Sequence, residues 1–196
     1  MVRMFVAGVL VGLLPATGVF ADPFPAGRIL SGASGDWNKD GTSDLAILVA
    51  PDNDDDGIGI YLYLTESDRP LQKLVASAPD KIWGNTKLDG LYGQDPEITA
   101  LANGSIAVMS QNSGIGRNRW EQTLTLAYRE GRFIVAGYTY SSYDTLDPDA
   151  GQSCDYNVVT GKFKTGETAG STAAKTVSIE DWTDEIGQTA CGLDLN

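Results

Sequence analysis

The sequence predicts an all-β or strongly β-rich single domain made of antiparallel hairpins, either sandwich-like or a partial propeller. Short runs of apolar residues recur along the chain, with Gly, Asn, Asp and Pro between them. After the N-terminal segment, no extended stretch has the periodicity of a helix. Successive strands joined by short turns favour antiparallel sheets.

The first 21 residues have the layout of a secretory signal peptide. Arg3 supplies a positive start, residues 4–14 form an apolar run, and small residues end at Ala21. The apolar run is too short to cross a membrane, which needs about 20 residues. We therefore expect a signal peptide over 1–21 and one domain over 22–196. We also expect a periplasmic or secreted location, with no membrane insertion after cleavage.

The first hairpin is predicted from two apolar runs, DLAILVA at 44–50 and GIGIYLYL at 57–64. The first run suits a strand that is buried on both faces, and in the second Tyr61 and Tyr63 alternate with aliphatic residues. The acidic segment 51–56 is long enough to connect them. A second hairpin is predicted at 97–110, because Asn103-Gly104 is flanked by apolar alternation. Residues 66–95 allow a strand or a short helix among loops.

A third hairpin is predicted at 120–140, with Glu130-Gly131 at its tip. A two-residue turn there places three pairs on a bulky apolar face: Tyr128 with Phe133, Leu126 with Val135, and Leu124 with Gly137. The other face would carry Ala127 with Ile134, Thr125 with Ala136, and Thr123 with Tyr138. This division is expected for a sheet that packs mainly on one side.

Cysteine content fits an oxidising compartment, because the chain contains two cysteines, Cys154 and Cys191. We expect them to form one disulfide that fixes the polar C-terminal region. Reactive thiols are disfavoured, since neither cysteine lies in a C-x-x-C pair or beside basic residues.

Charge and composition exclude several classes of function. The net charge is −12, so nucleic acid and anionic membranes should repel the protein. The chain contains no histidine, which excludes Ser-His-Asp and Cys-His catalysis and imidazole zinc sites. An enzyme here would depend on carboxylates, Lys, Tyr or a bound metal.

One loop, GDWNKDGTSD at 35–44, has the pattern of a calcium-binding loop. Counting from Asp36 as position 1, oxygen-bearing side chains occupy positions 1, 3, 5, 7 and 9, and Gly41 is at position 6. The predicted ligands are Asp36, Asn38, Asp40, Thr42 and Asp44, with Thr42 contributing its carbonyl. An EF-hand would need Glu at position 12, where the chain has Ile47 inside a strand. The alternative is a turn rich in Asp and Asn. Ca²⁺ is favoured over Mg²⁺ because a cage of protein oxygens suits the larger ion.

A second acidic loop holds Asp52, Asp54 and Asp56, followed by Gly57. It lacks an acid at position 9, which is Ile60, so a solvated hairpin is favoured over a second metal loop. The intervening strand separates the two loops, so they cannot share one ion.

Residues 35–64 resemble one FG-GAP repeat of the integrin α-subunit and VCBS type. The likeness includes the D-x-N-x-D-G-x-x-D loop from Asp36, the apolar strand ending at Ala50-Pro51, and the aromatic strand that starts at Gly57. The resemblance implies Ca²⁺ on the loop. Such repeats usually occur in tandem, seven forming a propeller, whereas this chain has one convincing copy.

Three functions remain open. The first is an exported, non-catalytic β-domain with a structural Ca²⁺, acting as a protein- or glycan-interaction module at the cell envelope. The second is a carboxylate-based or metal-assisted hydrolase of envelope polysaccharide, because 26 acids allow many pairs. The third is an assembly subunit that completes a larger β-structure. Seven aromatic residues could form a binding platform, although packing in the core is their more frequent role: Trp37, Trp83, Trp120, Trp182, Tyr138, Tyr140 and Tyr143.

Overall fold

The computed structural model describes residues 26–53, 55–87 and 90–193, so the predicted signal peptide lies outside the described residues. The first strands are β1 (Ile29–Gly35), β2 (Asp44–Val49), β3 (Ile58–Thr65), β4 (Gln72–Ile82), β5 (Glu97–Ala100) and β6 (Ile106–Asn112). They are followed by β7 (Asn118–Arg129), β8 (Arg132–Asp144), β9 (Gln152–Asn157), β10 (Lys162–Thr165) and β11 (Thr168–Ser171). The helical elements are the short 3₁₀ turns η1 (Ala26–Arg28) and η2 (Pro148–Ala150), and the helix α1 (Asp184–Cys191).

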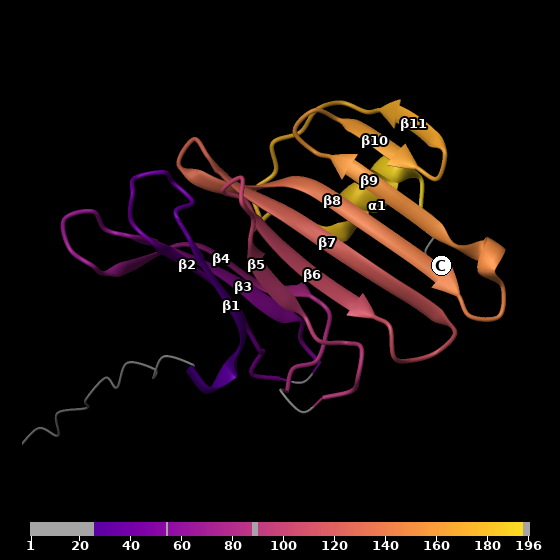
Figure 1. The fold of residues 1–196 in the computed structure, drawn as a ribbon, viewed down its shortest axis with the longest axis horizontal. Coiled ribbons are helices and arrows are strands. Elements are labelled where there is room, and N and C mark those ends of the chain that lie inside the picture. The colour runs from indigo at the N-terminus through magenta and orange to yellow at the C-terminus, as the bar shows by residue number, and fades with distance from the viewer. Residues whose placement is uncertain (1–25, 54, 88–89, 194–196) are drawn as a thin grey trace, which may run out of the picture.

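These strands form two antiparallel sheets, which confirms the predicted fold class. The small sheet has the order β1-β2-β3-β4, and the large sheet has the order β11-β10-β9-β8-β7-β6-β5. Figure 1 shows the small sheet against the β5 side of the large sheet and α1 towards the β9–β11 side. Every connection within a sheet joins neighbouring strands, as expected for successive hairpins.

Both sheets contribute to one hydrophobic core. The small sheet supplies Leu48, Ile60 and Leu62, all fully buried, because alternate side chains of each strand point to the same face. The facing side of the large sheet supplies Leu124 and Leu126. The sandwich-like alternative therefore describes the arrangement.

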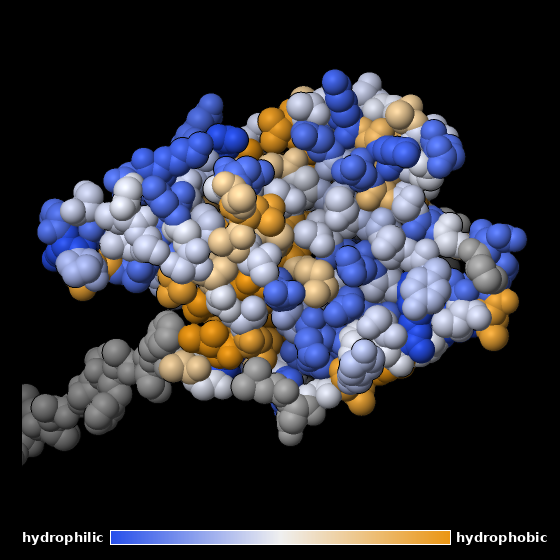
Figure 2. All heavy atoms as spheres, viewed as in Figure 1, coloured by the Kyte–Doolittle hydropathy of each residue, from blue (hydrophilic) through white to orange (hydrophobic). Residues whose placement is uncertain are grey.

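The two sheets meet along one corner, where β1 lies beside β5. The Ile98 amide donates a hydrogen bond to Ser31 Oγ at 3.2 Å across this corner. Figure 2 shows apolar surface where the two strands lie together, and a more hydrophilic face over β7 to β11.

Two predicted hairpins are confirmed. β2 pairs with β3 from Leu45 opposite Tyr63 to Val49 opposite Gly59, and five of the six β2 residues are buried. β5 pairs with β6 across residues 101–105, where Gly104 has φ +81°. The ambiguous region 66–95 contains β4, an eleven-residue strand, followed by loops.

The third hairpin has the predicted turn, but its predicted register holds only near the tip. Glu130 and Gly131 both have positive φ, at +48° and +82°, as a two-residue type I′ turn requires. Pairing is as predicted as far as Leu126 opposite Val135.

Beyond that pair, Ala136 forms a bulge, and the predicted pairs are wrong. Thr125 lies opposite Gly137, Leu124 opposite Tyr138, and Thr123 opposite Thr139. The extra residue moves Tyr138 to the apolar face, where it is fully buried.

The structure also contains one short α-helix, α1, which the sequence analysis did not locate. This helix has eight residues, too few for its periodicity to stand out in the sequence. Gly187 lets it approach the sheet, because a Cβ there would lie 2.4 Å from the Tyr138 ring. No helix in the described ranges is long and apolar enough to cross a membrane.

The predicted disulfide is present and joins β9 to the last residue of α1. Cys154 and Cys191 have their Cα atoms 5.7 Å apart and are separated by 37 residues in sequence. A loop of this length corresponds to about 4 kcal/mol of stabilisation in the chain-entropy model. The bond therefore holds α1 on the large sheet.

Candidate metal site

The predicted metal loop, residues 36–44, connects β1 to β2 at one end of the small sheet. Gly41 has φ +88° and Lys39 has φ +63°, so the chain turns sharply twice within the loop. A side chain at Gly41 would meet open space, so the positive φ is the reason for glycine at this position.

The carboxylate of Asp36 closes the loop through its backbone. Its Oδ1 accepts the Asp40 N–H and its Oδ2 accepts the Gly41 N–H, both at 3.0 Å. The Asn38 Oδ1 also accepts the Asp40 N–H at 3.0 Å, and its Nδ2 donates to Asp40 Oδ2 at 2.8 Å. These contacts bring positions 1, 3 and 5 of the loop together.

Asp40 is held in its ionised form by its own loop. Hydrogen bonds from the side chain and backbone of Thr42, and then from Asn38, lower the pKa of Asp40 below its usual value. The Thr42 N–H donates to Asp40 Oδ1 at 2.8 Å. The carboxylate therefore carries its full charge at neutral pH.

Asp44 differs from the other carboxylates because it is 1% exposed. Its Oδ2 accepts the Trp37 N–H and its Oδ1 accepts the Thr65 N–H, both at 2.9 Å. Trp37 lies inside the loop and Thr65 ends β3, so Asp44 ties the loop to the neighbouring strand. Burial of an acid with both oxygens bonded to backbone amides fits the rule that buried charges are paired.

The open side of the loop borders a cavity of about 460 Å³. Asn38 and Asp40 line it together with Glu66 and Tyr128, so two predicted ligands face accessible space. An ion or its water ligands could enter from this side.

The donor chemistry suits a hard cation, although the carboxylates do not converge closely. No three Asp, Glu or Cys side chains in the described part of the chain are grouped tightly enough to hold a metal by themselves. Each carboxylate of the loop can still accept further bonds, because a carboxylate has about four lone-pair sites. In addition, no lysine or arginine within the described ranges forms an ion pair with Asp36, Asp40 or Asp44. The five residues fit Ca²⁺ by ligand type.

The second acidic loop lies at the opposite end of β2, as predicted. Asp52 forms an ion pair with Arg28, and Asp56 accepts a hydrogen bond from Asn53 at 3.1 Å. Asp54 lies outside the described residues. These contacts support a hairpin loop, and a second metal site stays a prediction.

The aromatic residues divide into two groups. Four of them belong to the core: Trp37, Trp182, Tyr138 and Tyr140. In contrast, Trp83 is 48% exposed and packs against Trp120, with ring centroids 5.3 Å apart. Tyr143 is also exposed. Only part of the predicted platform is therefore open to a ligand.

Sequence reasoning missed Asp80, which has φ +50° within β4. Its sequence context, Pro79-Asp80-Lys81, has the residues of a turn but lies in a region of mixed signals. Asp80 accepts a hydrogen bond from the Gly57 N–H. Regular strand pairing does not predict this contact, because the register of β3 and β4 shifts there.

Comparison with known proteins adds no assignment, because no family model, curated protein or solved structure matches the chain.

Proposed function

We propose that this protein is an exported, non-catalytic interaction domain in which residues 36–44 bind Ca²⁺ as a structural ion. Asp36, Asn38, Asp40 and Asp44 would supply side-chain oxygens, and Thr42 its carbonyl. The bound ion would neutralise the loop charges. The resemblance of residues 35–64 to an FG-GAP repeat supports the same role.

One observation carries the proposal: three carboxylates lie within nine residues, around a glycine with φ +88°, and have no cationic partner among the described residues. Like charges so close together repel one another unless a counter-ion is present. Asp44 adds a mechanical reason, because it joins the loop to Thr65 on β3. Calcium would thus stabilise the end of the small sheet.

Exposed aromatic residues support an interaction role, and the two acids with a lowered pKa do not suit general acid catalysis. The pKa of Asp40 is lowered by Thr42, and that of Asp144 by the Leu146 amide and then by Arg117. A general acid needs a raised pKa, so neither residue suits that task. Trp83 and Tyr143 instead offer exposed rings for a protein or glycan at the cell envelope.

Thermal unfolding of residues 22–196 in EDTA and during a Ca²⁺ titration tests the metal site. For a Kd near 10⁻⁴ M, millimolar Ca²⁺ should stabilise the fold by about 2 kcal/mol. The Asp36→Ala/Asp40→Ala variant should lose this effect.

The matched control is Asp52→Ala/Asp56→Ala, which removes two acids from the other end of β2. It should respond to Ca²⁺ like the wild type. An unchanged melting temperature in the wild type would refute the calcium site, and loss of the response in the control alone would move the site to residues 52–56.

A further inference from the structure

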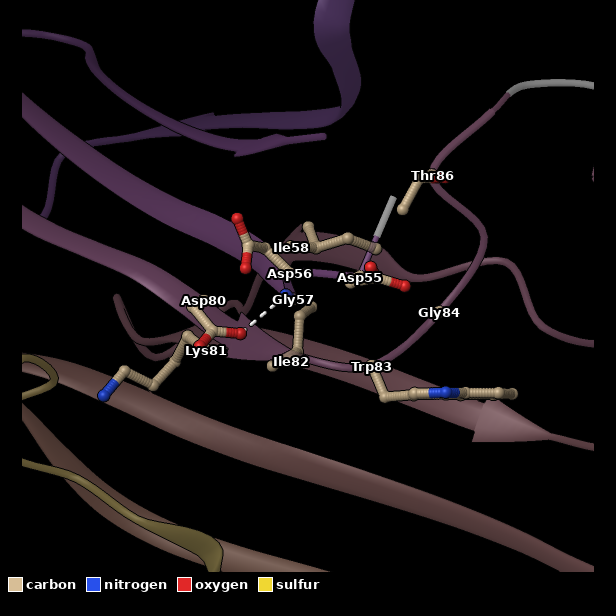
Figure 3. Close-up of a pocket in the computed structure, with 10 residues that line it drawn as sticks. All are labelled: Asp55, Asp56, Gly57, Ile58, Asp80, Lys81, Ile82, Trp83, Gly84 and Thr86. Carbon is tan, nitrogen blue, oxygen red and sulfur yellow. Dashed lines mark hydrogen bonds between the residues drawn. The ribbon is translucent and has the colours of Figure 1, made fainter. Parts of the chain in front are cut away.

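A second feature, at the opposite end of the small sheet, is a cavity of about 510 Å³. Asp55, Asp56, Asp80 and Trp83 line it, and Figure 3 shows how these side chains lie around it. None of residues 36–44 lines this cavity, which is formed by the segment between β2 and β3 and by the end of β4.

The cavity is formed by a bulge in β4. Ile60 lies opposite Ala78 and Ile58 opposite Ile82, so one residue of β3 faces three residues of β4. Asp80 is the middle residue of the three and has φ +50°, a conformation that costs free energy for a residue other than glycine. Bulges redirect side chains and are common beside functional sites.

Gly57 allows the bulge to close against β3. Its N–H donates to Asp80 Oδ1, and a Cβ on Gly57 would lie 2.5 Å from that oxygen. This contact fixes the Asp80 carboxylate at the cavity, as the dashed line in Figure 3 indicates.

The lysine of the bulge does not neutralise these acids. Lys81 Nζ donates to the carbonyl oxygens of Trp182 at 2.8 Å and Glu180 at 3.1 Å, and Figure 3 shows it directed away from Trp83. Within the described residues, no ion pair involves Asp55, Asp56 or Asp80. The lining therefore has an excess of negative charge, with three carboxylates and one lysine.

The aromatic part of the cavity is Trp83, which directly follows β4 and is 48% exposed. Trp120 of the large sheet packs against it with an interplanar angle of 54°, which holds the Trp83 ring in place. An open indole beside carboxylates is a favourable environment for a cation, because the ring face is electron-rich.

We propose that this cavity binds a lysine or arginine side chain from a basic segment of a protein partner. The cation would lie against the Trp83 ring, with Asp55 and Asp80 as its counter-charges. Lysine and arginine carry only hydrogen-bond donors, and carboxylates carry only acceptors, so the groups match. A neutral sugar would leave the excess negative charge of the lining without a counter-charge. The net charge of −12 would also speed association with a basic partner.

This inference rests on the proposed interaction function, but it does not require the calcium ion. The test uses three nonapeptides of glycine and serine, which carry three lysines, three arginines or three glutamines. Titrations monitor tryptophan fluorescence and the indole N–H of Trp83 by NMR. We expect saturable binding of both cationic peptides, a shift of the Trp83 resonance, and no binding of the glutamine peptide.

Variants separate the cavity from general charge attraction. Asp80→Asn keeps an acceptor for Gly57 and tolerates positive φ, and Trp83→Leu removes the ring; each should weaken binding about fivefold. Trp83→Phe should retain most of the affinity. The matched control Asp149→Asn removes one exposed charge elsewhere and should change affinity less than twofold.

Equal weakening in Asp149→Asn and Asp80→Asn would overturn the proposal, because binding would then reflect net charge alone. Binding of a neutral oligosaccharide that depends on Trp83 would also overturn the choice of ligand, while leaving an interaction function in place. If neither peptides nor oligosaccharide bind, the cavity is not the interaction site. The calcium titration still decides the role of residues 36–44 in that case.

Discussion

The two ends of the small sheet are both acidic, but they use their carboxylates differently. At the β1–β2 end, Asp36 and Asp44 accept hydrogen bonds from backbone amides of their own loop and of β3. At the opposite end, Asp55 and Asp80 line a cavity beside an exposed indole. The first arrangement organises the chain, whereas the second leaves charge available to a partner.

This difference shows that local density of acids does not define a role by itself. Asp44 differs from Asp55 in being buried and in accepting two backbone N–H groups. A buried carboxylate with two amide donors contributes to stability, because removing it leaves those amides without a partner. An exposed carboxylate contributes little to stability, and so it is free to serve binding.

The largest expected difference concerns Asp44 and Asp55. Asp44→Ala leaves the N–H groups of Trp37 and Thr65 unpaired in a buried position, so it should lower the free energy of unfolding by about 3 kcal/mol. Asp55→Ala, on the exposed rim of the cavity, should change it by less than about 0.5 kcal/mol. Urea unfolding of both variants in EDTA gives the two values.

Asp44→Asn serves as the matched control for charge. It retains one acceptor oxygen and should cost less than Asp44→Ala. Equal destabilisation by Asp44→Ala and Asp55→Ala would remove the distinction between the two ends.

The compact geometry of residues 36–44 could be predicted because the contacts within this loop are local. Asp36, Asn38 and Asp40 are two residues apart, so the sequence alone brings them together, and Gly41 marks the sharp turn. Only part of the role of Asp44 could be predicted from the sequence. Its place as the ninth residue could be counted, but its bond to Thr65 depends on the pairing of β2 with β3.

The cavity at the other end could not have been predicted, because it depends on irregular structure. The bulge at Pro79-Asp80-Lys81 breaks the period-two pattern from which strands are recognised, and Trp83 meets Trp120 only through packing of two sheets. The same cause explains the error in the β7–β8 register, where Ala136 is inserted without a turn signal. Regular hairpins can be predicted from this sequence, whereas bulges cannot.

Substitutions of Gly57 and Gly41, which lie at opposite ends of the small sheet, should have smaller effects on stability. Gly57→Ala brings a methyl group against Asp80 Oδ1 and should destabilise the fold by about 2 kcal/mol. Gly41→Ala meets no atom, but its φ of +88° should cost about 1 kcal/mol. Thermal unfolding of the two variants measures both effects.

The causes can be separated by adding Asp80→Gly to each variant. This change removes the carboxylate and suits the positive φ of residue 80. It should recover part of the stability lost in Gly57→Ala and none of that lost in Gly41→Ala. Strictly additive effects in both pairs would argue against a close contact between Gly57 and Asp80.

The smallest expected effect is a pH dependence of stability that arises from Asp144, the last residue of β8. Like Asp36 and Asp44, it accepts a hydrogen bond from a backbone amide. The Leu146 N–H donates to its Oδ1 at 2.8 Å, and Arg117 Nε donates to its Oδ2 at 2.6 Å. These bonds lower the pKa of Asp144 below its usual value. A lowered pKa in the folded state stabilises the fold above the unfolded pKa, and the contribution disappears as the pH falls through the folded value. Asp144→Asn should therefore be less stable than the wild type at pH 7, and the difference should shrink below about pH 4.

Unfolding in urea from pH 7 to pH 2 measures this convergence, with Asp55→Asn as the control for net charge. A constant difference across that range would show that the Asp144 side chain acts through packing, and not through its charge.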